Sequence, residues 1–68
     1  MELQINNQTK TYQVTTLSIQ DLLVIENSAD YTGIAVAVDH RVIPKNLWAT
    51  YFLQPGSSIL IITASQGG

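Results

Sequence analysis

The chain has 68 residues and no cysteine, so it forms one small domain that is stable by packing alone, and 46% apolar residues are compatible with that. Its net charge is −2, with only Lys10, Arg41 and Lys45 positive, which argues against nucleic acid binding because such proteins present a basic stripe to the phosphates. No apolar run approaches the roughly 20 residues that span a bilayer, and residues 1–10 lack the basic and apolar regions of a signal peptide, so we expect a cytoplasmic protein that binds no membrane.

The N-terminal residues predict a β-hairpin. Apolar and polar side chains alternate over residues 1–6, as they do in a strand with one buried face. Residues 6–8, Asn-Asn-Gln, supply a turn. The alternation then resumes over residues 9–14, with Tyr12 and Val14 directed toward the core.

An amphipathic helix is expected over residues 18–27, followed by a loop. Ser18 is a suitable N-cap, and Asp21, three residues later, gives a weaker variant of the capping box. Leu17 before the cap and Leu22 inside the helix are placed to form a hydrophobic staple. The residues that share one face of this helix are Ile19, Leu22, Leu23 and Glu26.

The second half of the chain predicts two further strands and a short helix. Large and small apolar side chains alternate over residues 34–38, which form a strand; residues 39–41 form a turn, and residues 42–43 a brief extended stretch. Pro44 suits the first position of a short helix, because its missing N–H is not needed there. The residues of this helix with the spacing to cover one end of the core are Leu47, Trp48 and Tyr51.

The last strand, residues 58–64, follows a turn at residues 54–57. The order is therefore strand, strand, helix, strand, short strand, short helix, strand. This order favours a mixed sheet that clasps one main helix, which is an economical way to build two layers. We expect an α+β fold of the β-grasp (ubiquitin-like) type, with a domain at residues 1–64 and a flexible tail at residues 65–68.

Conventional catalysis and metal binding find little support in the residues present. His40, the only histidine, stands beside Asp39 in a turn and is expected to be solvated. A catalytic dyad needs a nucleophile or a substrate pocket within hydrogen-bond reach, and a zinc site normally takes three or four protein ligands. The serines have structural explanations, and the chain has no glycine-rich phosphate loop. We expect a protein that is not an enzyme and that binds neither a metal nor a cofactor.

The last strand carries an uninterrupted apolar run. A strand with one buried face should alternate, but residues 59–62, Ile-Leu-Ile-Ile, do not. If Ile59 and Ile61 face the helix, Leu60 and Ile62 lie on the outer face beside the tail. Only 12% of the residues are charged, against about 25% in an average domain, so we favour a partner docking patch at Leu60 and Ile62. The alternative is that these residues raise strand propensity or are covered by another element.

The last four residues, Ser-Gln-Gly-Gly, offer no apolar side chain to anchor them to the domain. Extended, they reach at most about 14 Å. A frayed end is the simplest explanation of such a tail. However, glycine has no Cβ and fits channels that exclude other residues. After the last strand of a β-grasp domain, we expect Gln66 and Gly67 to thread into a partner and the carboxylate of Gly68 to react.

Several short motifs of the C-terminal half occur together in one known family. They are Val36-Ala37-Val38, Ile43-Pro44-Lys45, Trp48, Gly56, Ile59 to Ile62 and Gly67-Gly68. In these motifs the chain resembles the ThiS family, the ubiquitin-like sulfur carrier proteins of bacterial thiamin biosynthesis, whereas the N-terminal half agrees only in its hairpin and helix layout. The departures from the family pattern are Asp39, where asparagine is usual, Ser57, where aspartate is frequent, and Ala64 and Ser65, which are smaller or more polar than usual.

The resemblance implies a route for sulfur. A ThiF-type adenylyltransferase would use ATP to convert the Gly68 carboxylate into an acyl-adenylate. Sulfur from a persulfide donor would then displace AMP and leave a thiocarboxylate on Gly68. A ThiG-type thiazole synthase would use that sulfur to build the thiazole of thiamin. On this interpretation ATP belongs to the partner, and the chain itself holds no cofactor.

Three alternatives stay open on the sequence. The small subunit of molybdopterin synthase uses the same chemistry in another pathway, but it tends to be longer and lacks the Pro-Lys-x-x-Trp pattern of residues 44–48. A β-grasp interaction module with an accidental Gly-Gly is a second alternative. A protein modifier conjugated to lysines is the third.

Overall fold

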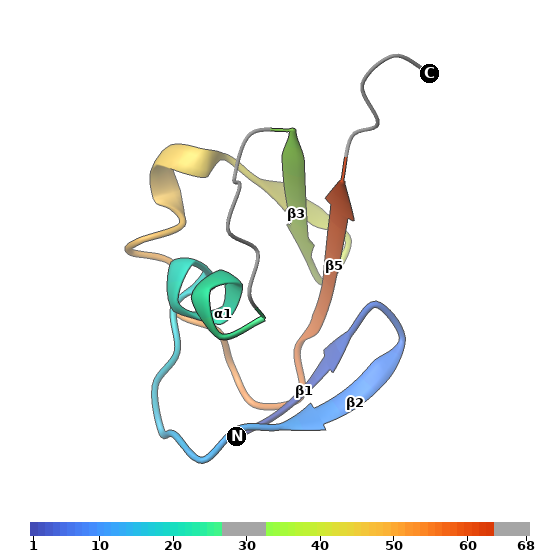
Figure 1. Ribbon diagram of the computed structural model, residues 1–68, viewed down its shortest axis with the longest axis vertical. Coiled ribbons are helices and arrows are strands. Elements are labelled where there is room, and N and C mark those ends of the chain that lie inside the picture. Colours follow the sequence, from blue (N-terminus) through green and yellow to red (C-terminus); the bar gives the residue numbers. More distant parts are fainter. Residues whose placement is uncertain (27–32, 64–68) are drawn as a thin grey trace.

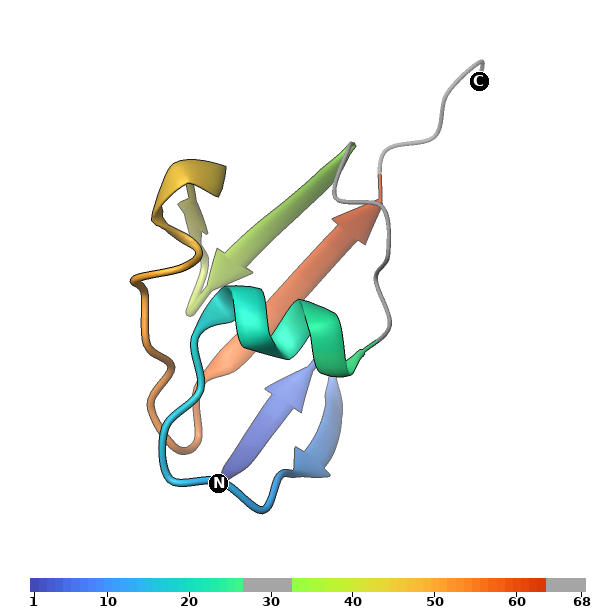
Figure 2. The ribbon, with the colours of Figure 1, turned by 60° about the vertical axis from the view of Figure 1, so that its left-hand side comes forward.

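The computed structural model describes residues 1–26 and 33–63, which form a five-stranded mixed sheet with one main helix across one face (Figures 1 and 2). In chain order the elements are β1 (Glu2–Ile5), β2 (Gln8–Thr11), α1 (Ile19–Ile25), β3 (Ile34–Val38), β4 (Arg41–Ile43), the 3₁₀ helix η1 (Lys45–Leu47) and β5 (Ser58–Thr63). The strand order is β2-β1-β5-β3-β4; β1 and β5 are parallel, and the other neighbours are antiparallel. This is the β-grasp arrangement that the element order predicted.

The N-terminal hairpin turns on two asparagines. Asn6 and Asn7 have φ values of 49° and 69°, the left-handed conformation that both central residues of a type I′ turn require and that asparagine tolerates. The turn is therefore two residues long, and Gln8, which the sequence placed in the turn, is the first residue of β2. Tyr12 packs against the core as predicted. The prediction for Val14 was wrong: β2 ends at Thr11, so its alternation does not extend to this exposed side chain.

Helix α1 begins where the capping pattern predicted. The Ser18 hydroxyl oxygen accepts a hydrogen bond from the Asp21 N–H at 3.0 Å. Leu17 and Leu22, the expected staple residues, are both buried in the core. The regular helix ends at Ile25, with Glu26 as its C-cap, and the predicted end at Asn27 lies outside the described residues. Figure 2 shows α1 lying across the front of β1, β5 and β3.

The second hairpin joins β3 and β4 through another pair of left-handed residues. Asp39 and His40 have φ values of 49° and 70°, and Val38 pairs with Arg41 across this turn. Val36 and Val38 point into the core, as the alternation predicted. The brief extended stretch expected at residues 42–43 is the end of β4.

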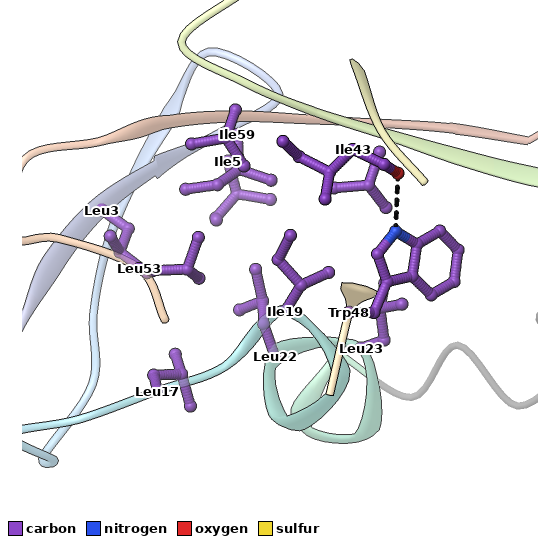
Figure 3. Close-up of a cluster of buried hydrophobic side chains, with 12 residues drawn as sticks. Leu3, Ile5, Leu17, Ile19, Leu22, Leu23, Ile43, Trp48, Leu53 and Ile59 are labelled. Carbon is purple, nitrogen blue, oxygen red and sulfur yellow. Dashed lines mark hydrogen bonds between the residues drawn. The ribbon is translucent and has the colours of Figure 1, made fainter. Parts of the chain in front are cut away.

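The short helix after Pro44 differs from the prediction in type. It is a 3₁₀ helix, and Pro44 is its N-cap, one position before the first helical residue. Trp48 is buried, and its Nε1–H donates to the Ile43 carbonyl oxygen at 2.9 Å (Figure 3). Tyr51 packs partly against the core. Leu47 was predicted to cover the core, but its side chain is 44% exposed. Consecutive residues of a 3₁₀ helix are about 120° apart, so once Trp48 faces inward, Leu47 is turned away.

The core lies between α1 and the sheet (Figure 3). Each strand except β2 contributes buried residues to it, and the Trp48 indole closes one end. The buried cluster consists of Leu3, Ile5, Leu17, Ile19, Leu22, Leu23, Val36, Val38, Ile43, Trp48, Leu53 and Ile59. The segment before β5 is fixed by a tight turn, in which Ser57 N–H donates to the Gln54 carbonyl at 3.0 Å and Gly56 takes a φ of 84°.

Candidate docking face and C-terminal exit

The apolar run of β5 divides between the two faces of the sheet, as predicted. Ile59 is buried beneath α1, and Ile61 packs partly against the same core. The neighbouring side chains point the other way: Leu60 is 45% exposed and Ile62 is 49% exposed. The orientation expected for the docking residues is therefore confirmed, and the alternative that another element covers them does not hold for the described residues.

The apolar surface extends beyond β5. Across the sheet Leu60 pairs with Ala37, Ala37 pairs with Val42, and Ile62 pairs with Ala35. These five residues share the face opposite α1, and we call them the outer patch. Val42, on the edge strand β4, is the most exposed of the large ones at 69%. Ala37, between Leu60 and Val42, carries only a methyl group and is 9% exposed, so the exposed area of the patch comes mainly from Val42, Leu60 and Ile62.

Sequence analysis missed the contribution of β3 and β4 to this surface. The signal was present: Ala35 and Ala37 alternate with the inward valines, and Val42 precedes the buried Ile43, so all three must face outward. The same alternation that places the valines in the core therefore also predicts the residues of the opposite face.

Strand β5 is also the element that leads to the C-terminus. Its last residue, Thr63, pairs with Ile34 at the start of β3. Ile62 of the outer patch directly precedes it, so the patch adjoins the last described residue before the C-terminus. Gln66, Gly67 and Gly68, the residues expected to thread into a partner and to react, lie outside the described residues. Their roles stay predictions.

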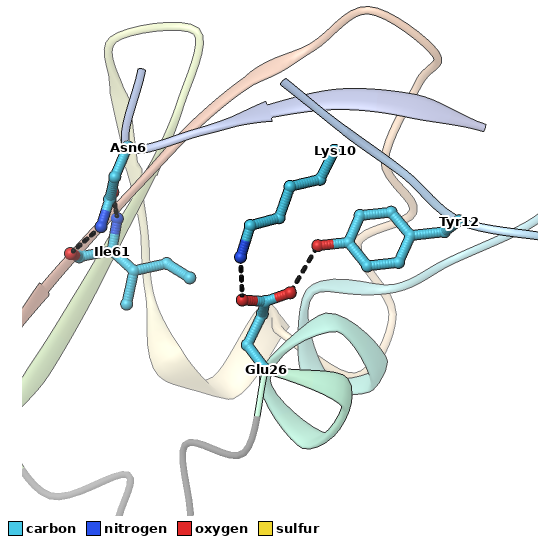
Figure 4. A network of polar contacts seen from close by, with 5 residues as sticks. All are labelled: Asn6, Lys10, Tyr12, Glu26 and Ile61. Carbon is cyan, nitrogen blue, oxygen red and sulfur yellow. Dashed lines mark hydrogen bonds and ion pairs between the residues drawn. The ribbon is translucent and has the colours of Figure 1, made fainter. Parts of the chain in front are cut away.

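A polar cluster ties the end of α1 to β2 (Figure 4). Lys10 Nζ forms an ion pair with Glu26 Oε1 at 2.7 Å, and the Tyr12 hydroxyl donates to Glu26 Oε2 at 2.6 Å. The hydrogen bond from Lys10, together with that from Tyr12, lowers the pKa of the Glu26 carboxyl below its usual value. Burial raises the pKa of the Tyr12 hydroxyl, and its bond to Glu26 raises it further. The cluster joins helix to sheet, away from the outer patch.

The described residues offer little else for chemistry. His40 is exposed in its turn, as expected. Residues 1–26 and 33–63 contain no group of three or more His, Cys, Asp or Glu side chains that could hold a metal ion. Within the same ranges, no helix is long and apolar enough to cross a membrane.

A family model matches residues 3–68, nearly the whole chain, and that model describes the ThiS family. The chain belongs to the ThiS family. No curated protein matches it. A ThiS chain therefore carries the outer patch and the Asn6–Asn7 hairpin described above.

Solved structures show the same fold. The crystal structure of a thiamine biosynthesis protein, ThiS, from Geobacter metallireducens superposes with a TM-score of 0.87 over 100% of both chains, at 19% identity. An NMR solution structure of a thiamine biosynthesis protein from the same organism superposes with a TM-score of 0.83, at 19% identity, over 100% of this chain and 88% of that one. The predicted β-grasp fold is thus confirmed as the fold of a ThiS protein.

Proposed function

We propose that this chain is a sulfur carrier for thiamin biosynthesis, with its sulfur carried as a thiocarboxylate on Gly68. Membership of the ThiS family supports the pathway. The observation that carries the proposal is the position of the outer patch, which ends at β5, the strand that leads to Gly67 and Gly68. A partner that docks on Leu60 and Ile62 therefore holds the chain next to the start of its reactive tail.

The chemistry begins with activation of the carboxylate. An oxygen of the Gly68 carboxylate attacks the α-phosphorus of ATP in the active site of a ThiF-type adenylyltransferase, and pyrophosphate leaves. The product is an acyl-adenylate. AMP is a good leaving group, whereas the unactivated carboxylate would have to expel an oxide ion. ATP is bound by the partner in this proposal, and the carrier contributes only the carboxylate and the narrow Gln66-Gly67 segment that delivers it.

Sulfur enters in the second step. The terminal sulfur of a persulfide donor attacks the acyl carbon, and AMP leaves to give an acyl disulfide. A second thiol then cleaves the S–S bond, releasing the Gly68 thiocarboxylate and a disulfide. A ThiG-type thiazole synthase accepts the sulfur, and the carboxylate is regenerated. The adenylation step uses ATP and the sulfur-transfer step uses reduced thiols, which the cytosol maintains. We therefore place the carrier in the cytoplasm, where it acts as a substrate of these enzymes rather than as an enzyme.

The mass of the intact chain tests the proposal. After incubation with the adenylyltransferase, ATP and a persulfide source, replacement of one oxygen by sulfur adds about 16 Da to the chain. The matched control is the chain without Gly67 and Gly68, which should not gain this mass. An unchanged mass in the full-length chain would favour an interaction module without a reactive tail. Use of the thiocarboxylated chain by the large subunit of molybdopterin synthase, but not by thiazole synthase, would favour the other pathway.

A further inference from the structure

Strand β1 leaves the sheet before β5 ends. The two strands pair at Gln4 with Ser58 and at Ile5 with Ile59. The N–H of Asn6 still donates to the Ile59 carbonyl oxygen at 2.9 Å, but its φ of 49° then turns the chain toward β2. The main chain of β1 therefore supplies no partner for the next inward residue of the ladder, Ile61.

The side chain of Asn6 supplies that partner. Ile61 N–H donates to Asn6 Oδ1 at 2.8 Å, and Asn6 Nδ2 donates to the Ile61 carbonyl oxygen at 3.3 Å (Figure 4). A primary amide has the same donor and acceptor as a peptide group, so it extends the β1 ladder by one position. Because the Ile61 main chain presents one N–H and one C=O, only one orientation of the amide satisfies both.

We propose that Asn6 is a positioning residue for the C-terminal tail. Its side-chain amide holds β5 from the β1 side at Ile61, and so sets the place and direction from which the chain continues toward Gly68. Without the amide, Ile61 to Thr63 are held in the sheet from the β3 side alone. The inference rests on the proposed sulfur-carrier function, because the tail needs positioning only if its terminal carboxylate reacts.

The position of Ile62 connects docking of the partner on the outer patch with delivery of the Gly68 carboxylate to its active site. Ile62 of the outer patch lies between Ile61, which Asn6 holds, and Thr63, the last residue of β5. Once a partner has docked on the patch, a fixed tail origin raises the fraction of complexes in which Gly68 reaches the active site. Asn6 thus acts on the reaction through β5 and touches no reacting atom.

The other end of β5 shows why asparagine is required at position 6. There Asp39 N–H donates to the Ser58 carbonyl at 2.8 Å, and Asp39 Oδ1 accepts from Ser58 N–H at 2.9 Å. A carboxylate suffices at position 39 because the main chain provides the donor. At position 6 the side chain must provide both groups, and an ionised aspartate has no donor.

A matched pair of glycine variants isolates the side chain. Asn6 and Asn7 are adjacent in one turn, both with positive φ, and glycine adopts this conformation readily. Within the described residues the exposed Asn7 side chain forms no hydrogen bond, so N7G changes the turn without removing a bond to β5, whereas N6G removes both bonds to Ile61. We expect N6G to accelerate amide hydrogen exchange at Ile61 by about tenfold, roughly the worth of the lost hydrogen bonding, and N7G to leave it unchanged. Equal amide exchange rates at Ile61 in the two variants would contradict the inference that the Asn6 side chain holds β5.

Kinetics then test whether the anchor positions the tail. In ATP–pyrophosphate exchange catalysed by the adenylyltransferase, N6G should lower kcat roughly three- to tenfold with KM within about twofold, and N7G should match the unmodified chain. If Asn6 only stabilised the fold, N6G would reduce the amount of folded carrier and raise the apparent KM instead. That result would overturn the proposal. If the unmodified chain supports no ATP–pyrophosphate exchange, the proposed function fails, and the positioning role of Asn6 fails with it. Amide hydrogen exchange at Ile61 still decides whether Asn6 anchors β5.

Discussion

At the scale of single residues, the two hairpin turns are built from non-glycine residues with positive φ. Asn6, Asn7, Asp39 and His40 all adopt the left-handed conformation, which asparagine and aspartate reach at lower cost than most residues. The first residue of each turn also bonds to β5 through its side chain, Asn6 to Ile61 and Asp39 to Ser58. The turns therefore fix the central strand at both ends in addition to reversing the chain. The departure from the family pattern at position 39 is compatible with this role, because aspartate supplies the acceptor that Ser58 needs.

The Glu26 cluster gives a prediction with a pH dependence. Its contacts hold the pKa of Glu26 below the usual value in the folded chain, so the unfolded chain binds more protons at acid pH. The stability from the cluster is therefore fully present above the unfolded pKa of about 4.3 and is lost as the pH falls through the lower folded value. We expect E26Q to reduce the free energy of unfolding by about 1 kcal/mol at neutral pH, with a smaller difference in acid.

Urea unfolding at about pH 7 and about pH 3 measures this difference. The control is E2Q, which removes an exposed carboxylate for which the described residues show no ion pair. A loss for E26Q that is equal at both pH values would mean that packing of the side chain, and not its charge, supplies the stability.

At the scale of elements, α1 holds the domain together through three completely buried side chains, Ile19, Leu22 and Leu23. L22A should lower the free energy of unfolding by roughly 2–5 kcal/mol, because it removes a buried side chain and leaves a cavity beside the sheet. V24A on the exposed side of the same helix should stay within about 0.5 kcal/mol. Thermal or urea unfolding measures both, and a small effect of L22A would contradict the observed orientation of the helix.

The elements differ in how much of them the sequence could predict. The Ser18 cap, the burial of Leu22 and the alternation of β3 follow from local chemistry, so they were predictable. Leu47 was assigned to the wrong side because local spacing does not show which residue of the short helix faces inward; in the structure that residue is Trp48, which is buried and donates to the Ile43 carbonyl. The bond from Asn6 to Ile61 joins residues 55 positions apart, and no local pattern encodes such a contact.

In the molecule as a whole, the outer patch and the tail have separate proposed roles: the patch binds the partner, and the tail carries the reacting carboxylate. The helix covers one face of the sheet, and the opposite face presents Val42, Leu60 and Ile62. Apolar surface of this kind is characteristic of protein interaction sites. If docking and reaction use separate parts of the chain, it should be possible to remove either one and keep the other.

The docking half of this division is tested by L60D and I62D. The double variant should keep its fold, because both side chains point away from the core, and should weaken binding to the adenylyltransferase at least tenfold, the effect of burying an unpaired charge at an interface. V42D tests the same face from the edge strand β4 and disturbs the centre of the sheet less. V24D, on the helix side, is the control and should bind normally. Unchanged binding by a folded double variant would exclude the outer patch as the docking site, and unfolding would show that these side chains are needed for the stability of β5.

The reactive half of the division is tested at Gly67 and Gly68. Deletion of both glycines should abolish adenylation, because the shortened chain places its carboxylate about 7 Å, two extended residues, short of the intended position. G67V should also block the reaction, because a β-branched side chain both widens the segment and stiffens its backbone.

In each variant we expect the free energy of unfolding to change by less than about 0.5 kcal/mol, since the deleted or replaced glycine contributes no side chain to the core. Binding to the adenylyltransferase should persist, because Leu60 and Ile62 are intact. A truncated chain that still supports thiazole formation would show that sulfur is not carried on the tail, whereas a truncated chain that no longer binds would show that the tail, and not the outer patch, supplies the affinity.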